Sequence, residues 1–194
     1  MKKFFMIAVM TVVCMTASAQ KMRHGAGQIT VQPMIGLSSG YLRGEEETAT
    51  GTVKYENNDS RTGLALGVEG EYYTTTPWLS VSAGLMYQQQ GWKIKGYGAD
   101  KVDFINIPVL ANFYVAKGFA LKIGLQPGFL VSADNKDAFE SFNLSMPIGL
   151  SYEFKNGITL DLRGTPGLTA VNKNSNSDWK LRSDCSTLTI GYKF

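Results

Sequence analysis

The chain has 194 residues, of which 44% are hydrophobic and 18% charged, and its 19 Lys and Arg against 16 Asp and Glu give a net charge of +3. This length predicts one domain and excludes a multidomain machine. The 21 Gly and the 3 Trp, 9 Tyr and 10 Phe against 6 Pro make the chain too apolar for a disordered protein, and it lacks the strict period of collagen, so we predict a packed all-β domain.

Residues 1–19 have the three parts of a secretory signal peptide. Two lysines form a basic start, an apolar segment runs from Phe4 to Val13, and small residues precede a predicted cleavage after Ala19. Cys14 lies inside the apolar segment rather than at the cleavage site, so we do not expect a lipid anchor. The signal predicts export from the cytoplasm.

The exported part, residues 20–194, is close to neutral. Loss of Lys2 and Lys3 leaves 17 basic and 16 acidic residues, so no basic surface argues for a nucleic-acid partner. Cys185 is its only cysteine, which excludes an intramolecular disulfide. No run of about 18 apolar residues follows the signal, which excludes a transmembrane helix.

Apolar residues alternate with polar or small residues in eight stretches of the exported chain. This period of two is typical of strands that have two different faces. In chain order the predicted strands are Ile29–Tyr41, Leu64–Tyr72, Leu79–Gln90, Ile105–Phe113, Phe119–Phe129, Phe142–Phe154, Ile158–Arg163 and Thr187–Phe194. The pattern predicts an all-β fold, an eight-stranded antiparallel up-and-down β-barrel.

Three features favour a transmembrane barrel with its apolar face toward lipid over a soluble barrel. Short connections alternate with long ones, as in outer-membrane barrels. Aromatic residues gather at both ends of the apolar faces, as expected for interfacial girdles. The chain closes on an alternating strand with Tyr192 and the C-terminal Phe194, a pattern that resembles the signal by which the outer-membrane barrel assembly machinery recognises its clients.

A resemblance to a known family lies in the middle of the chain. Residues Asp103–Ser132, DFINIPVLANFYVAKGFALKIGLQPGFLVS, resemble the central hairpin of the PorT-family outer-membrane β-barrels of Gram-negative bacteria, which are related in architecture to small barrels of the OmpA and OmpX kind. The Ile107-Pro108 start, the short turn and the Gly-rich return strand carry the resemblance. It implies an eight-stranded outer-membrane barrel and no particular activity.

Four prolines interrupt the pattern of the predicted strands. Pro33, Pro108, Pro127 and Pro147 each remove a hydrogen-bond donor from the ladder, and a closed barrel has no edge strand to hold them. We therefore expect local bulges near them. Beyond such a bulge the inward and outward faces can differ by one residue from the simple alternation.

The inward face of the predicted strands carries seven charged residues: Glu69, Glu71, Lys122, Glu153, Asp161, Arg163 and Lys193. Eight strands enclose an interior just wide enough for side chains. Buried charges need partners, so we predict a charge-paired network that fills the lumen. A proton or ion path is the alternative function of the same residues.

No catalytic, cofactor-binding or metal-binding residue is predicted. The single histidine, His24, falls in the tail before the first strand, where we expect it to be solvated, and a lone histidine disfavours both zinc and His-assisted hydrolysis. The acidic loop Arg43–Arg61 is expected to be solvated, with a bridging divalent cation as the alternative. We expect the loop Thr169–Lys180 to contribute packing, and Cys185 to be a small strand residue.

The predicted organisation is a signal peptide (1–19), a periplasmic N-terminal tail (20–28) and an outer-membrane barrel (29–194) with both termini in the periplasm. The predicted function is non-enzymatic, a structural or surface-interaction role through extracellular loops or a partner protein. Expected partners are outer-membrane lipids, the assembly machinery and an envelope protein of unknown identity. A pore, an outer-leaflet lipid-modifying enzyme and a soluble periplasmic lipid-binding barrel are the alternatives.

Overall fold

The computed structural model describes residues 24–48, 51–55, 59–94, 98–133, 139–171 and 179–194, so the predicted signal peptide lies outside the described residues. Within these ranges no helix is long and apolar enough to cross a membrane. The strands are β1 Ile29–Thr48, β2 Gly51–Tyr55, β3 Asp59–Tyr73, β4 Leu79–Ile94, β5 Gly98–Asn106, β6 Val109–Ala116, β7 Phe119–Ala133, β8 Phe142–Ser145, β9 Ile148–Glu153, β10 Ile158–Thr165 and β11 Trp179–Tyr192.

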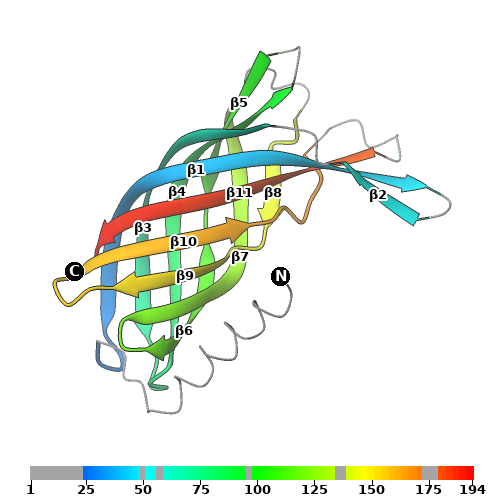
Figure 1. Cartoon of the computed structure of the whole chain (residues 1–194). Helices are drawn as coiled ribbons and strands as arrows, with labels where there is room; N and C mark the ends of the chain where they lie inside the picture. Colours follow the sequence, from blue (N-terminus) through cyan, green and yellow to red (C-terminus); the bar gives the residue numbers. More distant parts are fainter. Residues whose placement is uncertain (1–23, 49–50, 56–58, 95–97, 134–138, 172–178) are drawn as a thin grey trace, which may run out of the picture.

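These strands form one closed antiparallel wall (Figure 1). Neighbours in sequence pair around the barrel, and β1 pairs with β11 to close it. Strands β5 and β6 share one position in the wall, as do β8 and β9, while β2 continues the hairpin of β1 beyond the wall. Eight wall positions result, which confirms the predicted eight-stranded barrel.

The two ends of the barrel differ. At the turn end, β3–β4, β6–β7 and β9–β10 are joined by short turns, and β1 begins and β11 ends there. Gly118 and Gly157 in two of these turns have φ of 80° and 85°, a region that favours glycine. At the other end, the hairpin end, β1–β2 and β4–β5 pair as hairpins and project from the wall in Figure 1.

The prediction that Arg43–Arg61 is a loop is therefore wrong in part. Strand β1 continues to Thr48, pairing with β11 as far as Glu46 and with β2 from Gly44 to Thr48. Strands can continue past the closed wall because pairing with neighbours on both sides still satisfies the backbone N–H and C=O groups.

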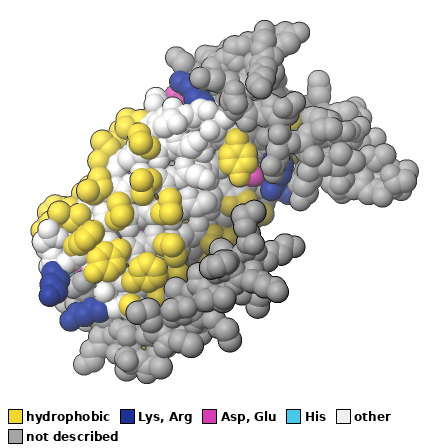
Figure 2. All heavy atoms as spheres, in the orientation of Figure 1, with side chains coloured by type: hydrophobic (Ala, Val, Ile, Leu, Met, Phe, Trp, Pro, Cys, Tyr) yellow, Lys and Arg dark blue, Asp and Glu magenta, His cyan; other side chains and the backbone are white. Residues whose placement is uncertain are grey.

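Burial of the side chains shows which face of the wall is inside. Most inward residues are polar, and they are nearly inaccessible, whereas outward residues such as Ile35, Leu125 and Leu162 are apolar and about half exposed. Figure 2 shows hydrophobic side chains spread over the described part of one face of the molecule. A polar interior with an apolar exterior is the reverse of a soluble barrel and suits a lipid environment.

The prolines do not shift the faces, so the expectation of bulges beside them is wrong. Pro33 and Pro127 lie within β1 and β7, and Pro108 and Pro147 lie in the short gaps β5–β6 and β8–β9. Buried and exposed residues alternate without a break through all four positions. The carbonyl groups of Pro108 and Pro147 still accept bonds from Gly84 and Gly124, because proline loses only its donor. The irregular registers occur elsewhere, including between Asp103 and Phe104.

Glycines allow neighbouring strands to approach closely, which gives a first testable prediction. A Cβ at Gly124 would overlap the backbone carbonyl of Val109, whereas a Cβ at Gly70 would lie 3.8 Å from the nearest atom, the carbonyl oxygen of Ala83. We expect Gly124→Ala to lower the free energy of unfolding by about 1–3 kcal/mol through overpacking. Gly70→Ala is the matched control and should change it little. Urea unfolding in lipid vesicles measures both, and equal stability of the two variants would contradict the close approach.

Candidate functional site

The interior holds a central quartet of charges, Glu69, Lys122, Asp161 and Arg163. Strands β3, β7 and β10 supply them, and alternation points all four inward. Lys122 Nζ lies 2.8 Å from Glu69 Oε1 and 2.9 Å from Asp161 Oδ2. Arg163 donates to Glu69 Oε2 at 2.6 Å and to both oxygens of Asp161 at 2.5 and 2.9 Å. Each charge has two opposite partners, and each side chain is at most 3% exposed.

A second cluster lies toward the turn end, around Lys193. Its ammonium group donates to Glu71 Oε2 at 2.7 Å and lies 3.2 Å from Glu153 Oε2. The hydroxyl of Tyr114 donates to the other oxygen of Glu71 at 2.6 Å, and the hydroxyl of Tyr73 lies 3.0 Å from Lys193 Nζ. The structure thus gives every one of the seven charged residues singled out in the sequence at least one ion pair.

His24 is not the solvated tail residue expected from the sequence. Its Nε2 lies 3.1 Å from Glu153 Oε1, and its ring lies 4.8 Å, centroid to centroid, from that of Tyr73. The residues that follow are hydrogen-bonded through their backbone. The N–H of Gly27 donates to the carbonyl of Tyr73, and the N–H of Tyr73 donates to the carbonyl of Gln28. The ring of His24 therefore lies at the inner rim of the turn end, which side-chain alternation could not indicate because this segment is not a strand.

Neutral amides and hydroxyls occupy the interior between the quartet and the hairpin end. Gln88 is central: it donates to Thr187 Oγ1 at 2.9 Å and accepts from Asn106 Nδ2 at 2.6 Å. Ser183 donates to Gln90 Oε1 at 3.0 Å. The bonds of Gln88 with Thr187 and of Ser183 with Gln90 join β4 to β11 across the interior, so this layer is cross-linked.

An apolar cluster lies toward the hairpin end. It consists of buried Val102, Phe104, Phe139 and Val171, with Leu130, Ala133 and Leu181 against them. Sequence reasoning missed it, because the strand was predicted to begin only at Ile105. The available signal was that Val102, Phe104 and Asn106 continue the inward period of two.

The charged and amide side chains of the interior are bonded mainly to one another. Within the described part of the chain, no group of three or more His, Cys, Asp or Glu residues is placed to hold a metal ion. Cys185 is buried and has a free thiol. Of the two loops considered as binding sites, residues 49–50 and 56–58 of the first and 172–178 of the second lie outside the described residues.

Aromatic side chains mark both ends of the outer surface. At the turn end, Tyr192 and Phe194 lie 4.7 Å apart, centroid to centroid, and are exposed on the outside. Tyr152 and Phe154 form a similar pair at this end, and Phe129 and Phe142 form one toward the hairpin end. Phe194 also donates its N–H to the carbonyl of Val31, so the last residue still belongs to the barrel seam.

A closed wall of eight strands with a polar interior and an apolar exterior defines a transmembrane β-barrel of the outer-membrane class. The chain belongs to the outer membrane protein beta-barrel domain family, whose sequence profile matches residues 18–172. Membership of this family implies the outer membrane of a Gram-negative bacterium. No curated protein sequence matches the chain.

Several solved structures are similar. Neisserial surface protein A has 15% identity and a TM-score of 0.49, with 88% of this chain and 100% of that chain covered. Ail, the attachment invasion locus protein of Yersinia pestis, has 18% identity and a TM-score of 0.46, with 87% of this chain and 99% of that chain covered. OprG from Pseudomonas aeruginosa has 15% identity and a TM-score of 0.46, with 88% of this chain and 97% of that chain covered.

Proposed function

We propose that this protein is a non-enzymatic outer-membrane barrel that acts at the cell surface, through its hairpin end, on a partner molecule or as a structural element. Within its family we place it with the PorT-type barrels, because Asp103–Ser132 resemble their central hairpin. Residues 1–19 serve as its export signal in this proposal, and the assembly machinery recognises the strand that ends in Tyr192 and Phe194.

The proposed orientation puts the turn end in the periplasm and the hairpin end outside the cell. Outer-membrane barrels have short periplasmic turns and longer extracellular connections. The short turns after β3, β6 and β9 lie at one end together with the start of β1 and the end of β11. An even number of wall strands requires both chain ends on the same side.

The observation that carries the proposal is the contrast between the interior and the hairpin end. The quartet, the amide layer and the apolar cluster fill the lumen, so its charges are engaged with one another. At the hairpin end, β11, β1 and β2 form a sheet beyond the wall, and β2 pairs only with β1 within the described residues. Exposed strand edges are surfaces on which another chain can pair.

The alternative functions have less support. A pore needs a continuous path, and eight strands leave room for side chains rather than for a water channel. A lipid-modifying enzyme at the outer rim would need a base there, and the single histidine lies at the turn end against Glu153. A soluble lipid-binding barrel would bury its apolar face, whereas Ile35, Leu125 and Leu162 point outward here.

The test uses one cysteine at each end and a membrane-impermeant, thiol-reactive photocrosslinker applied to intact cells. Lys54→Cys, in β2, should be labelled and should give discrete crosslinked products on illumination. Asn156→Cys, in the exposed turn before β10, should be labelled only after the outer membrane is permeabilised. The wild-type chain is the background control, because Cys185 is buried.

Two results would contradict the proposal separately. Labelling of Asn156→Cys in intact cells would invert the orientation. Efficient labelling of Lys54→Cys without any discrete crosslinked product would argue against a surface partner and leave only the structural role.

A further inference from the structure

We propose that the outer surface of the β1–β11 seam is a specific phospholipid site that holds one acyl chain, with the phosphate group at Lys155. The site faces the leaflet at the turn end, so assigning it to the periplasmic leaflet rests on the proposed orientation. It is distinct from the surface role of the hairpin end, because it lies at the opposite end of the barrel wall.

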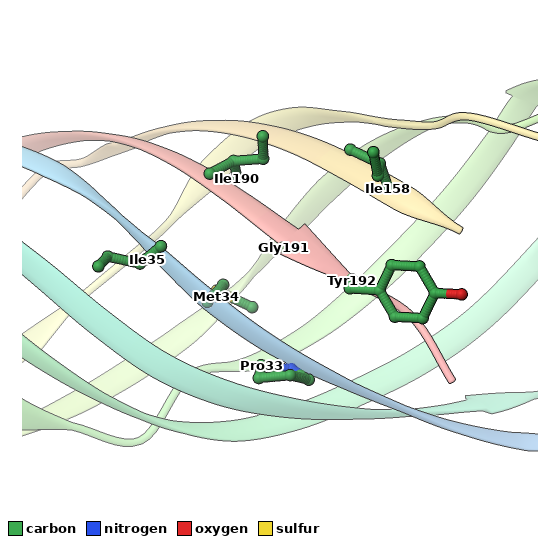
Figure 3. Close-up of a pocket in the computed structure, with 7 residues that line it drawn as sticks. All are labelled: Pro33, Met34, Ile35, Ile158, Ile190, Gly191 and Tyr192. Atoms are coloured by element: carbon green, nitrogen blue, oxygen red, sulfur yellow. The ribbon is translucent and has the colours of Figure 1, made fainter. Parts of the chain in front are cut away.

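The seam carries a shallow apolar groove (Figure 3). Its lining comes from three neighbouring strands: Pro33, Met34 and Ile35 of β1, Ile158 of β10, and Ile190, Gly191 and Tyr192 of β11. Ile35 and Ile190 are about half exposed on the outer surface. Nothing polar projects from these side chains except the hydroxyl of Tyr192, which points away from the other labelled residues in Figure 3.

Local sequence explains why the groove forms at this seam. Pro33 has a short ring between the larger outward side chains of Ile35, Ile190 and Tyr192. Val31 and Phe194 exchange both backbone bonds across the seam. An antiparallel ladder repeats this exchange at every second pair, so the next bonded pair is Pro33 with Tyr192, and Pro33 has no N–H to donate. The floor of the groove is thus backbone with one ladder bond missing.

The turn beside the groove supplies the charge that complements a phosphate. Phe154 donates to the carbonyl of Ile158, which closes the turn that contains Lys155 and Asn156. Lys155 is exposed at the tip of this turn, and a Cβ at Gly157 would lie 3.2 Å from the ring of Tyr192.

The depth of the groove along the barrel also fits a lipid. Tyr192 belongs to the aromatic end of the outer surface, where such rings lie at the level of the headgroups. An acyl chain in the groove would extend from this level past Ile190 and Ile35 toward the middle of the wall. The test compares a change at Lys155 with the same change at Lys117, in another turn of this end, so that both variants lower the net charge of the end equally.

The test measures binding of phosphatidylglycerol to the purified, detergent-solubilised protein by native mass spectrometry. The wild type should bind a first lipid more tightly than later ones. Ile158→Trp fills the groove and should abolish this first tight binding. Lys155→Gln should weaken it about fivefold, the effect of one basic residue near an anionic lipid surface.

Two matched controls should bind as the wild type does. Leu85→Trp adds the same ring to another outward position, on β4. Leu85 pairs with Val68, which in turn pairs with Pro33, so it lies at the same height on the wall as the groove. Lys117→Gln removes a basic residue from the turn between β6 and β7, away from the groove. Heat-shifted gel mobility confirms that each variant is folded. If Ile158→Trp does not fold, the comparison of first-lipid binding between Lys155→Gln and Lys117→Gln still tests the proposal.

Equal first-lipid binding by all variants would overturn the proposal. Loss of the first tight binding in both Ile158→Trp and Leu85→Trp would show that lipid adheres to the apolar wall in general, and would also overturn the proposal. The assay uses neither cells nor a surface partner, so its failure leaves the labelling experiment at Lys54 and Asn156 unaffected. An inverted result of the labelling experiment would change the leaflet to which the lipid site is assigned, but not the lipid binding that this assay measures.

Discussion

Replacing Glu69 with glutamine should destabilise the barrel by about 3–5 kcal/mol, the cost of leaving a buried charge without its partner. Glu69 accepts from both Lys122 and Arg163, at 2.8 and 2.6 Å. The variant leaves these two cations with Asp161 alone, so the quartet gains a net positive charge in a sealed interior. Urea unfolding in lipid vesicles measures the loss.

A double-mutant cycle separates charge imbalance from lost packing. Lys122→Met alone should also destabilise, because it leaves Glu69 and Asp161 with Arg163 alone. The double variant Glu69→Gln, Lys122→Met restores neutrality and keeps the contacts of Arg163 with Asp161, so it should cost clearly less than the sum of the single changes. Additive costs would show that the four residues do not act as one unit.

Replacing Ile123 with arginine should cost about 2–4 kcal/mol, as for a charge on the lipid face at the membrane midplane. Ile123 lies near the middle of β7, pairs with Ala111 and Ile148 on either side, and is 42% exposed. The same measurement of unfolding in vesicles applies. The expected loss of stability is large because hydrocarbon surrounds this side chain. A position exposed to water would tolerate arginine readily.

The matched control for this change is Val131→Arg, on the same outer face of β7 and equally exposed at 43%. It lies near the hairpin end, where arginine can reach water or headgroups, so the cost should be only about 0–1 kcal/mol. Equal costs at the two positions would argue that no hydrocarbon layer surrounds the middle of the barrel.

The two stability predictions concern opposite faces of the same strands. Lys122 and Ile123 are adjacent in β7, yet Lys122 is buried among carboxylates and Ile123 is exposed. In a soluble barrel the polar residue would be outside and the apolar residue inside. One face of the strand therefore borders a polar interior and the other borders lipid. A shift of one residue in register would move every side chain to the wrong face, which is why it would be costly.

Strand number and the division of residues between two faces follow from the sequence alone, because successive side chains of a strand point to opposite faces. Connection lengths, aromatic positions and the closing strand then favour lipid on the apolar side, which assigns Glu69, Lys122 and Arg163 to the interior without coordinates. The same local rule holds through Pro33 and Pro127, since a missing donor removes one bond but leaves the direction of later side chains unchanged.

Only the tertiary structure decides which of these residues meet. Arg163 and Glu69 are separated by 94 positions in the chain, and their contact depends on the curvature and stagger of the closed wall rather than on any local pattern. The contact of His24 with Glu153, the extension of β1 beyond the wall and the groove at the β1–β11 seam have the same origin. Each joins segments from distant parts of the chain, and barrel closure alone brings the first strand beside the last.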